Sequence, residues 1–337
     1  MTRYGPQFGP DITFLGVPRA DLDDPQTYAD ADVVILGAPF DGGTSARPGA
    51  RFGPMAIRMT DYLPHDGSRP SLALRTDGLA DLTVVDAGDV EMYSGDIEKA
   101  LPLLEAAVEK VTRAGAIPVI LGGDHSIAFP DAKGVANVLG HGRVSMLHFD
   151  AHADTGDIEF GSLWGHGQPM RRLIESGALR GDRFLQIGLR GYWPPPETLD
   201  WMAGQGMRSY EMTEIGLRGL QECLTEAFAK ATDECEGVFL SVDIDVCDPG
   251  HAPGTGTPEP GGLSARELLD SVRRICLELP VVGLDVVEVS PPYDHSDITA
   301  ALANRVVLEA LSAIARRRQD VRDGTTWNPG SPLLGGR

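Results

Sequence analysis

The chain has 337 residues, of which 42% are hydrophobic and 23% are charged, and its formal net charge at pH 7 is −20. This composition is that of a globular protein with a substantial core, and the length allows one large domain or two ordinary ones. The negative charge argues against nucleic acid as a partner, because phosphates require a basic surface, and it favours cations, either metal ions or a positively charged substrate.

Apolar runs rich in β-branched residues alternate along the chain with segments of helical periodicity. Strands are predicted over residues 32–38, 83–88, 116–123, 143–150, 183–189, 207–210, 237–245 and 281–289. Helices are predicted over residues 97–113, 126–139, 169–176, 196–204, 217–232, 264–277 and 297–317. Strict alternation of this kind implies a mostly parallel sheet with helices on both faces.

The predicted elements form one domain between two less regular ends. Residues 1–30 are rich in Pro, Asp and Gly, and we expect them to form an arm that wraps the domain or a neighbouring subunit. Residues 31–318 contain no internal repeat and no Gly/Ser linker, so they are predicted to be a single domain. Residues 319–337 have little hydrophobic pattern and are predicted to form a flexible tail.

Nothing in the sequence indicates export or insertion into a membrane. Residues 1–20 lack a continuous apolar region, and no stretch reaches the ~20 uninterrupted apolar residues of a membrane helix. The four cysteines are far apart and include no C-x-x-C pair, which argues against a disulfide framework or a zinc ribbon. We therefore expect a cytoplasmic protein with no membrane partner.

Acidic residues and histidines gather where three predicted strands end, and in two of these motifs they occupy alternate positions. LGGDHS (121–126) contains Asp124 and His125, LHFDAHADT (147–155) contains Asp150, His152 and Asp154, and LSVDIDVCDP (240–249) contains Asp243 and Asp245. Side chains two apart on a strand point the same way, and ligand sites in open parallel sheets lie beyond the carboxyl ends of the strands. The three clusters should therefore meet in one crevice, where buried like charges require a cation.

The donor set is mostly carboxylate with a minority of imidazole, which suits Mn²⁺ or Mg²⁺ better than a thiolate zinc site. Six ligands with bridging carboxylates fit two ions ~3.5–4 Å apart that share and activate one water. Aspartates after strands are also typical helix N-caps and turn formers. Three converging clusters, one of them D-x-H-x-D, nevertheless favour metal binding.

Long segments of the chain resemble the ureohydrolase family of agmatinases, arginases and related guanidino-acid hydrolases. They are GAPFDGGTSARPGARFGPMAIR (37–58), GGDHS (122–126), HFDAHADT (148–155), SVDIDVCDP (241–249), PGTGTPEPGG (253–262) and GLDVVEVSPPYD (283–294). They follow the family order across nearly the whole chain. The resemblance implies a three-layer α/β/α fold with a mostly parallel central sheet. It also implies hydrolysis of a guanidinium to urea and an amine at two Mn²⁺ ions, with Ni²⁺, Co²⁺ or Zn²⁺ as alternatives.

Mapped by motif, the resemblance also implies the role of each site residue. The metal ligands would be His125, Asp150, His152, Asp154, Asp243 and Asp245, with Asp124 in support. Asp154 could in addition hold the activated water by a hydrogen bond. Glu288 resembles the glutamate that pairs with the guanidinium, which two carboxylate oxygens would orient by meeting two N–H groups in one plane. His166 in SLWGHGQPM resembles the histidine that shuttles a proton to the departing amine.

Other aromatic side chains near these motifs carry weaker signals. Trp164 is predicted to wall the substrate pocket, although an aromatic residue beside a glycine loop is more often a packing residue. His148 alternates with the ligand positions but lies deeper in its strand, so we expect a core histidine with satisfied hydrogen bonds.

The substrate is expected to be a small cationic guanidino compound, and agmatine is favoured. SARPGARFGP and VEVSPPYD resemble agmatinase-like members, and the negative chain would attract the second cation of agmatine. However, GHGQP (165–169) looks arginase-like where HGTPF is expected. Arg47, Arg51 or Arg190 could also contact the carboxylate of a guanidino acid. The alternatives are therefore 4-guanidinobutyrate, 3-guanidinopropionate and a proclavaminate-type substrate.

Two other kinds of protein were weighed against this interpretation. A catalytically silent metal-binding or assembly protein on the same fold should lack a ligand, His166 or Glu288, and none is missing. A two-metal phosphoesterase should carry basic or Gly-rich phosphate-binding elements near the acids, and none is apparent. The resemblance further suggests a homo-oligomer, either a trimer or a hexamer.

Overall fold

A single parallel sheet runs through the centre of the protein. The computed structural model describes residues 12–328, and within them eight strands pair in the order β2-β1-β3-β8-β7-β4-β5-β6. The strands are β1 (Val33–Gly37), β2 (Val84–Asp89), β3 (Ile117–Leu121), β4 (Val144–Phe149), β5 (Phe184–Ile187), β6 (Arg208–Tyr210), β7 (Gly237–Asp243) and β8 (Val281–Val287). All their pairings are parallel.

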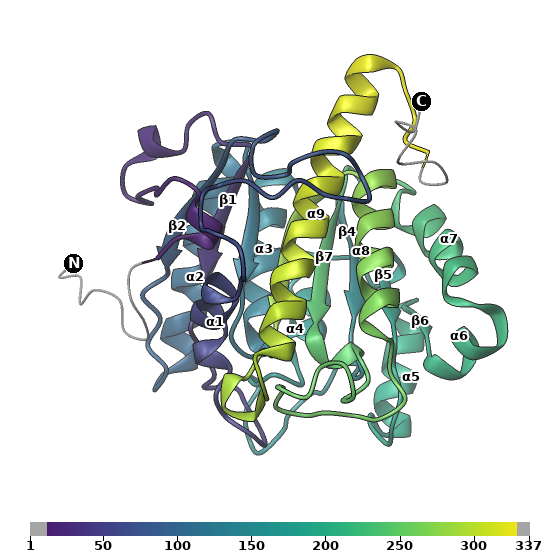
Figure 1. Cartoon of the computed structure of the whole chain (residues 1–337). Helices are drawn as coiled ribbons and strands as arrows, with labels where there is room; N and C mark the ends of the chain where they lie inside the picture. Colours follow the sequence, from purple (N-terminus) through teal and green to yellow (C-terminus); the bar gives the residue numbers. More distant parts are fainter. Residues whose placement is uncertain (1–11, 329–337) are drawn as a thin grey trace.

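Helices cover both faces of this sheet, so the predicted three-layer α/β/α fold is confirmed (Figure 1). The helices are α1 (Gly53–Met59), α2 (Ile97–Arg113), α3 (Ala128–Leu139), α4 (Pro169–Glu175), α5 (Pro196–Gly204), α6 (Met212–Arg218), α7 (Leu220–Ala231), α8 (Ala265–Glu278) and α9 (Ile298–Asp323). Side chains of β1 alternate between two cores. Val33 and Ile35 belong to the core that includes residues of α7, α8 and α9, whereas Val34 and Leu36 belong to the core that includes residues of α2, α3 and α4.

The structure corrects three details of the predicted elements. The helix expected over residues 217–232 is two helices, because Gly219 separates α6 from α7 in a left-handed conformation with φ of 91°. The short helix α1 was not predicted. The boundary of the flexible tail at residue 319 was wrong, since α9 continues to Asp323 and Trp327 packs against the core beyond it. The remainder of the predicted tail, residues 329–337, lies outside the described residues.

The long helix α9 belongs to the core. By length and composition alone it could cross a membrane, but 78% of its most apolar window is buried inside the protein, where it packs against α8 and α1. The described part of the N-terminal arm lies along the edge strand β2. There Asp86 accepts hydrogen bonds from the Phe14 amide through its carboxylate and from the Ala20 amide through its carbonyl. Residues 1–11 of the predicted arm lie outside the described residues.

The four central strands β3, β8, β7 and β4 are neighbours in the sheet. Each of them ends in a motif that the sequence singled out: GGDHS follows β3, the segment with Glu288 follows β8, and the two acidic motifs follow β7 and β4. Parallel strands present their carboxyl ends at one edge of the sheet. The topology therefore brings four separate motifs to one place.

Candidate metal centre and active site

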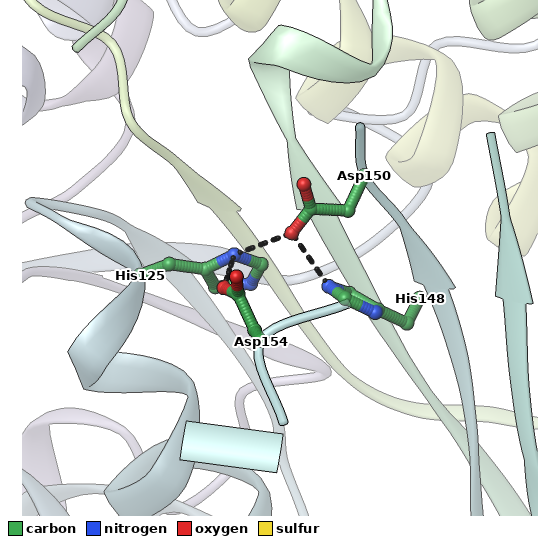
Figure 2. A group of neighbouring side chains, drawn as sticks. All are labelled: His125, His148, Asp150 and Asp154. Atoms are coloured by element: carbon green, nitrogen blue, oxygen red, sulfur yellow. Dashed lines mark hydrogen bonds and ion pairs between the residues drawn. The ribbon is translucent and has the colours of Figure 1, made fainter. Parts of the chain in front are cut away.

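One ring nitrogen of His125 faces three carboxylates. Its Nδ1 lies 3.0 Å from Asp150 Oδ2, 3.0 Å from Asp154 Oδ2 and 3.1 Å from Asp243 Oδ2. All four side chains are buried, and Figure 2 shows His125, Asp150 and Asp154 pointing toward one another. His125 Nδ1 has no hydrogen-bond partner of good geometry among the described residues. Buried oxygen and nitrogen atoms that converge in this way are typical of ligands around a cation.

A second cluster adjoins the first through Asp150. His152 Nδ1 lies 3.2 Å from Asp245 Oδ2 and 3.5 Å from Asp150 Oδ1. Asp150 therefore presents one oxygen to each cluster, which is the disposition of a bridging carboxylate. The structure thus brings together all six side chains that the sequence predicted as ligands, in two groups that share one member.

Several of these aspartates also form turns, which is the alternative role of aspartates that follow strands. Asp243 Oδ1 accepts the Asp245 amide hydrogen at 2.8 Å, and Asp150 Oδ1 accepts the His152 amide hydrogen at 2.6 Å. In both residues Oδ2 remains directed at His125. The two roles are thus compatible, because the turn fixes the carboxylate plane and leaves an oxygen for the cluster.

The cluster carries more negative than positive charge. Burial raises the pKa of Asp243 well above its ordinary value, and the Asp245 and Asp150 carboxylates raise it further. Burial alone would lower the pKa of His125, but the carboxylates of Asp150, Asp154 and Asp243 around its ring hold that pKa well above its usual range. Such a site requires either bound protons or divalent cations, and its oxygen-rich donors suit hard cations.

Polar side chains behind the cluster hold the ligands in position. His148 Nε2 lies 2.8 Å from Asp150 Oδ2 (Figure 2), and Gln186 Nε2 lies 3.1 Å from His148 Nδ1. Both nitrogens of this buried ring thus have partners, in line with the core histidine predicted from sequence. Ser241 Oγ lies 2.9 Å from His125 Nε2 and donates to Asp285 Oδ1 at 2.7 Å.

Glu288 links the metal cluster to His166. Its Oε1 accepts the His125 amide hydrogen at 2.9 Å and lies 2.9 Å from His166 Nδ1. Its Oε2 is buried and has no partner among the described residues. Oε1 already has two donors, which fill its two lone pairs. The contact through both oxygens that the sequence predicted is therefore narrowed to Oε2, the oxygen that still lacks a donor.

His166 is held between Glu288 and Ser45. Its Nε2 lies 2.6 Å from Ser45 Oγ. Burial would lower the pKa of His166, but the negative charge of Glu288 and the hydrogen bond to it raise that pKa to about 9. The ring therefore carries a proton at neutral pH. Ser45 lies 121 residues from His166 in the chain, so no local spacing in the sequence relates the two.

The three arginines proposed as contacts for a guanidino acid differ in their surroundings. Arg51 forms an ion pair with Asp41. Arg190 donates to backbone carbonyls, including those of Asp245 at 2.7 Å and Glu259 at 2.6 Å. Both therefore have structural partners. Arg47 is exposed and lines a cavity of about 550 Å³ together with Tyr293, His295 and four prolines.

A second cavity, of about 280 Å³, contains His166. Its walls are residues 42–45 and a loop that contributes Glu159, Phe160, Ser162, Trp164, Gly165 and Gln168. Trp164 thus lies in the pocket wall, and its ring also packs against Phe129 with a centroid distance of 5.2 Å. Glu159 was not identified from the sequence, because an acid in an irregular loop carries no periodic signal. Asp124, the predicted supporting residue, accepts the Gly43 amide hydrogen at 2.7 Å and so fixes the opposite wall.

Comparison with known proteins identifies the family. The model of the arginase family matches residues 31–313. The chain belongs to the arginase family. This confirms the resemblance found in the sequence motifs.

The arginase-family chain has close relatives of several specificities. It is 40% identical to proclavaminate amidinohydrolase of Streptomyces clavuligerus, over 94% of this chain and 96% of the relative. It is 38% identical to mitochondrial guanidino acid hydrolase of Homo sapiens, over 85% of this chain and 79% of the relative. It is also 38% identical to mitochondrial agmatinase of Gallus gallus, over 86% of this chain and 83% of the relative.

Solved structures share the fold. That of the Streptomyces clavuligerus proclavaminate amidinohydrolase has a TM-score of 0.82 and 38% identity, covering 93% of this chain and 100% of that one. Formiminoglutamase of Trypanosoma cruzi, solved with Mn²⁺, has a TM-score of 0.78 and 27% identity, covering 87% of this chain and 96% of that one.

Proposed function

We propose that this arginase-family protein hydrolyses a guanidino compound to urea and an amine at a pair of Mn²⁺ ions. The observation that carries the proposal is Asp150, whose two oxygens face two separate groups of candidate ligands. Beside it, Glu288 accepts the His125 amide hydrogen through Oε1 and leaves Oε2 without a partner. A hydrolase of guanidinium needs both a site for two cations and a carboxylate for the substrate.

The residues present fit two divalent cations. His125, Asp154 and Asp243 would hold one ion, His152 and Asp245 the other, and Asp150 both. When bound, such a pair of ions activates water as a nucleophile. Manganese is favoured over softer metals by the carboxylate-rich donor set, and a relative of the same fold was solved with Mn²⁺.

The other site residues bind the substrate and move a proton. Glu288 Oε2 accepts N–H groups of the guanidinium, and its buried position makes that charge-assisted contact strong. Because His125 fixes Oε1, the guanidinium carbon is oriented toward the metal cluster. Protonated His166, held on the same carboxylate, donates its proton to the departing amine.

Agmatine is the substrate we favour, because the negative chain attracts a dication and an agmatinase is among the relatives. A guanidino acid is the second candidate. The other two relatives described above are named for such acids, and Arg47 lines a cavity that could hold a carboxylate.

A urea-release screen tests the function. The substrates are agmatine, arginine, 4-guanidinobutyrate, 3-guanidinopropionate and guanidine, each assayed with Mn²⁺, Ni²⁺, Co²⁺ and Zn²⁺. We expect urea from at least one substrate, loss of activity with chelator and recovery with metal. Urea from none of them would refute the proposal.

Two substitutions test the ligand assignment. Asp150→Ala should lower metal content from two ions to one or none, because it removes the shared ligand, and Asp243→Ala should weaken the His125 group. Metal analysis after gel filtration measures both. His166→Ala serves as the matched control, since it should slow urea release while metal content stays unchanged.

A further inference from the structure

A tight turn forms the outer wall of the cavity that contains His166. Glu159 and Ser162 exchange both backbone hydrogen bonds, at 3.0 and 2.9 Å, and the two residues between them have φ of 51° and 79°. Positive φ at both central positions of a two-residue turn is typical of type I′. Glu159, Phe160 and Ser162 of this turn line the cavity.

Phe160 occupies a costly position at the tip of this turn. A bulky side chain with φ of 51° is strained, and the first central position of such a turn normally carries Gly, Asn or Asp. The ring is 93% exposed yet lines the cavity. Neither its backbone conformation nor its exposure stabilises the folded protein, and residues kept under such strain are often those that contact ligands.

The carboxylate of Glu159 lies in a recess between two glycines. A Cβ on either Gly156 or Gly167 would collide with its oxygens, so the absence of side chains there makes room for the carboxylate. Within residues 12–328 the carboxylate has neither a hydrogen bond nor an ion pair, although it is half-buried. A half-buried, unpaired carboxylate beside a cavity attracts a cation.

The basic residues close to this loop do not neutralise Glu159. Arg171 and Arg172 pair with the other acid of the loop, Asp157, at 3.3 and 3.1 Å. Among the residues lining the cavity, His166 is the sole cation, and it lies on Glu288. The wall that carries Glu159 is therefore negative where a ligand would meet it.

We propose that this cavity binds the non-reacting end of the substrate, and that Glu159 selects a cationic amine there. The inference rests on the proposed function. With the guanidinium on Glu288 Oε2, the chain of the substrate passes His166 and places its ammonium at Glu159, under the ring of Phe160. An ammonium beside a carboxylate and an aromatic face gains both an ion pair and a cation–π contact. The cavity volume of about 280 Å³ suits a small linear molecule.

A carboxylate at the same end of the substrate would meet a like charge at Glu159. A guanidino acid would instead have to turn toward the separate cavity lined by Arg47. The two orientations predict opposite effects of changing Glu159, which makes them distinguishable by kinetics.

The test compares agmatine with 4-guanidinobutyrate, which have similar lengths and opposite terminal charges. In the manganese-loaded enzyme, Glu159→Gln should lower kcat/KM for agmatine about tenfold or more, the loss expected for one charge-assisted contact. It should leave kcat/KM for 4-guanidinobutyrate unchanged or raised. Glu159→Lys should lower kcat/KM for agmatine further and raise kcat/KM for 4-guanidinobutyrate further. Glu197→Gln removes an acid on α5 outside the cavity and should change neither value.

Three results would overturn the inference while leaving the proposed function intact. One is urea from 4-guanidinobutyrate but not from agmatine by the unaltered enzyme. Another is an equal loss for both substrates in Glu159→Gln, which would mark a structural role. The third is an unchanged kcat/KM for agmatine in that variant. Absence of urea from every guanidino compound would refute the function itself. Manganese content and circular dichroism of each variant show that the site and the fold are retained.

Discussion

Arg190 holds the group of His152 and Asp245 in place through the backbone, without contacting either side chain. Its guanidinium donates to the carbonyls of Gly188, Asp245, Val246, Cys247, Glu259 and Pro260. These carbonyls belong to three loops, after β5, after β7 and in the Pro/Gly-rich segment 253–262. These contacts include no carboxylate, so the donors of Arg190 join the loop that carries Asp245 to the two loops beside it.

Replacing Arg190 with Met keeps most of the side-chain length and removes every donor. The two shortest contacts, to Asp245 at 2.7 Å and Glu259 at 2.6 Å, dominate the loss. Hydrogen bonds from a charged donor contribute roughly 1.5–3 kcal/mol each, so two of them amount to about 3–6 kcal/mol. Arg190 is only partly buried and water can replace some of these contacts, which reduces the expected fall in the free energy of unfolding to about 2–4 kcal/mol.

The assay combines urea denaturation with manganese titration followed by electron paramagnetic resonance. Arg190→Met should bind one ion normally and the second, at His152 and Asp245, at least tenfold more weakly, because the Asp245 backbone is no longer fixed. Arg266→Met is the matched control, since that arginine is 90% exposed and lies on α8. Two equally tight ions and an unchanged free energy of unfolding in Arg190→Met would refute this reasoning.

Three further predictions concern buried or strained groups. Asp131 is fully buried, and neither of its oxygens has a partner among the described residues. Asp131→Val should therefore raise the free energy of unfolding, measured by urea denaturation, by about 1–3 kcal/mol. A lower free energy of unfolding would show that the carboxylate has a stabilising partner. Glu288→Gln should lower the pKa of His166 below about 9, because the carboxylate stabilises the protonated ring; an unchanged pKa in an NMR titration of metal-free protein would contradict this. Phe160→Gly should raise the melting temperature, because the left-handed conformation costs a bulky residue about 1–2 kcal/mol. The same change should raise KM for agmatine. A lower melting temperature would contradict the strain at Phe160.

The sequence predicted the sheet well because the central strands are buried on both faces, which produces unbroken apolar runs such as that of β7. It predicted which acidic side chains and histidines converge because alternate spacing and strand ends are local signals. It did not separate α6 from α7, where one glycine outweighs a continuous helical pattern, and it missed α1, which begins in a Gly/Pro segment.

Contacts between loops that are distant in the sequence could not be predicted from local signals. The pairing of Ser45 with His166 depends on how two loops fold over the sheet, and nothing in either loop specifies the other. The same is true of Glu159, whose recess is made by Gly156 and Gly167. The signal that identifies Glu159 is an unpaired carboxylate in a cavity wall, which exists only in three dimensions.

The short connection from His125 to Glu288 has a thermodynamic consequence. The His125 amide donates to Glu288 Oε1, and the Glu288 amide in turn donates to the Gly123 carbonyl. A ligand on the carboxylate and an ion on the imidazole, as proposed above, would therefore order the same small piece of backbone. The partner that binds first orders this backbone, so the second partner binds more tightly. The ligand must raise the affinity for the ion by the same factor as the ion raises the affinity for the ligand. A guanidinium that resists hydrolysis should accordingly retard the escape of manganese.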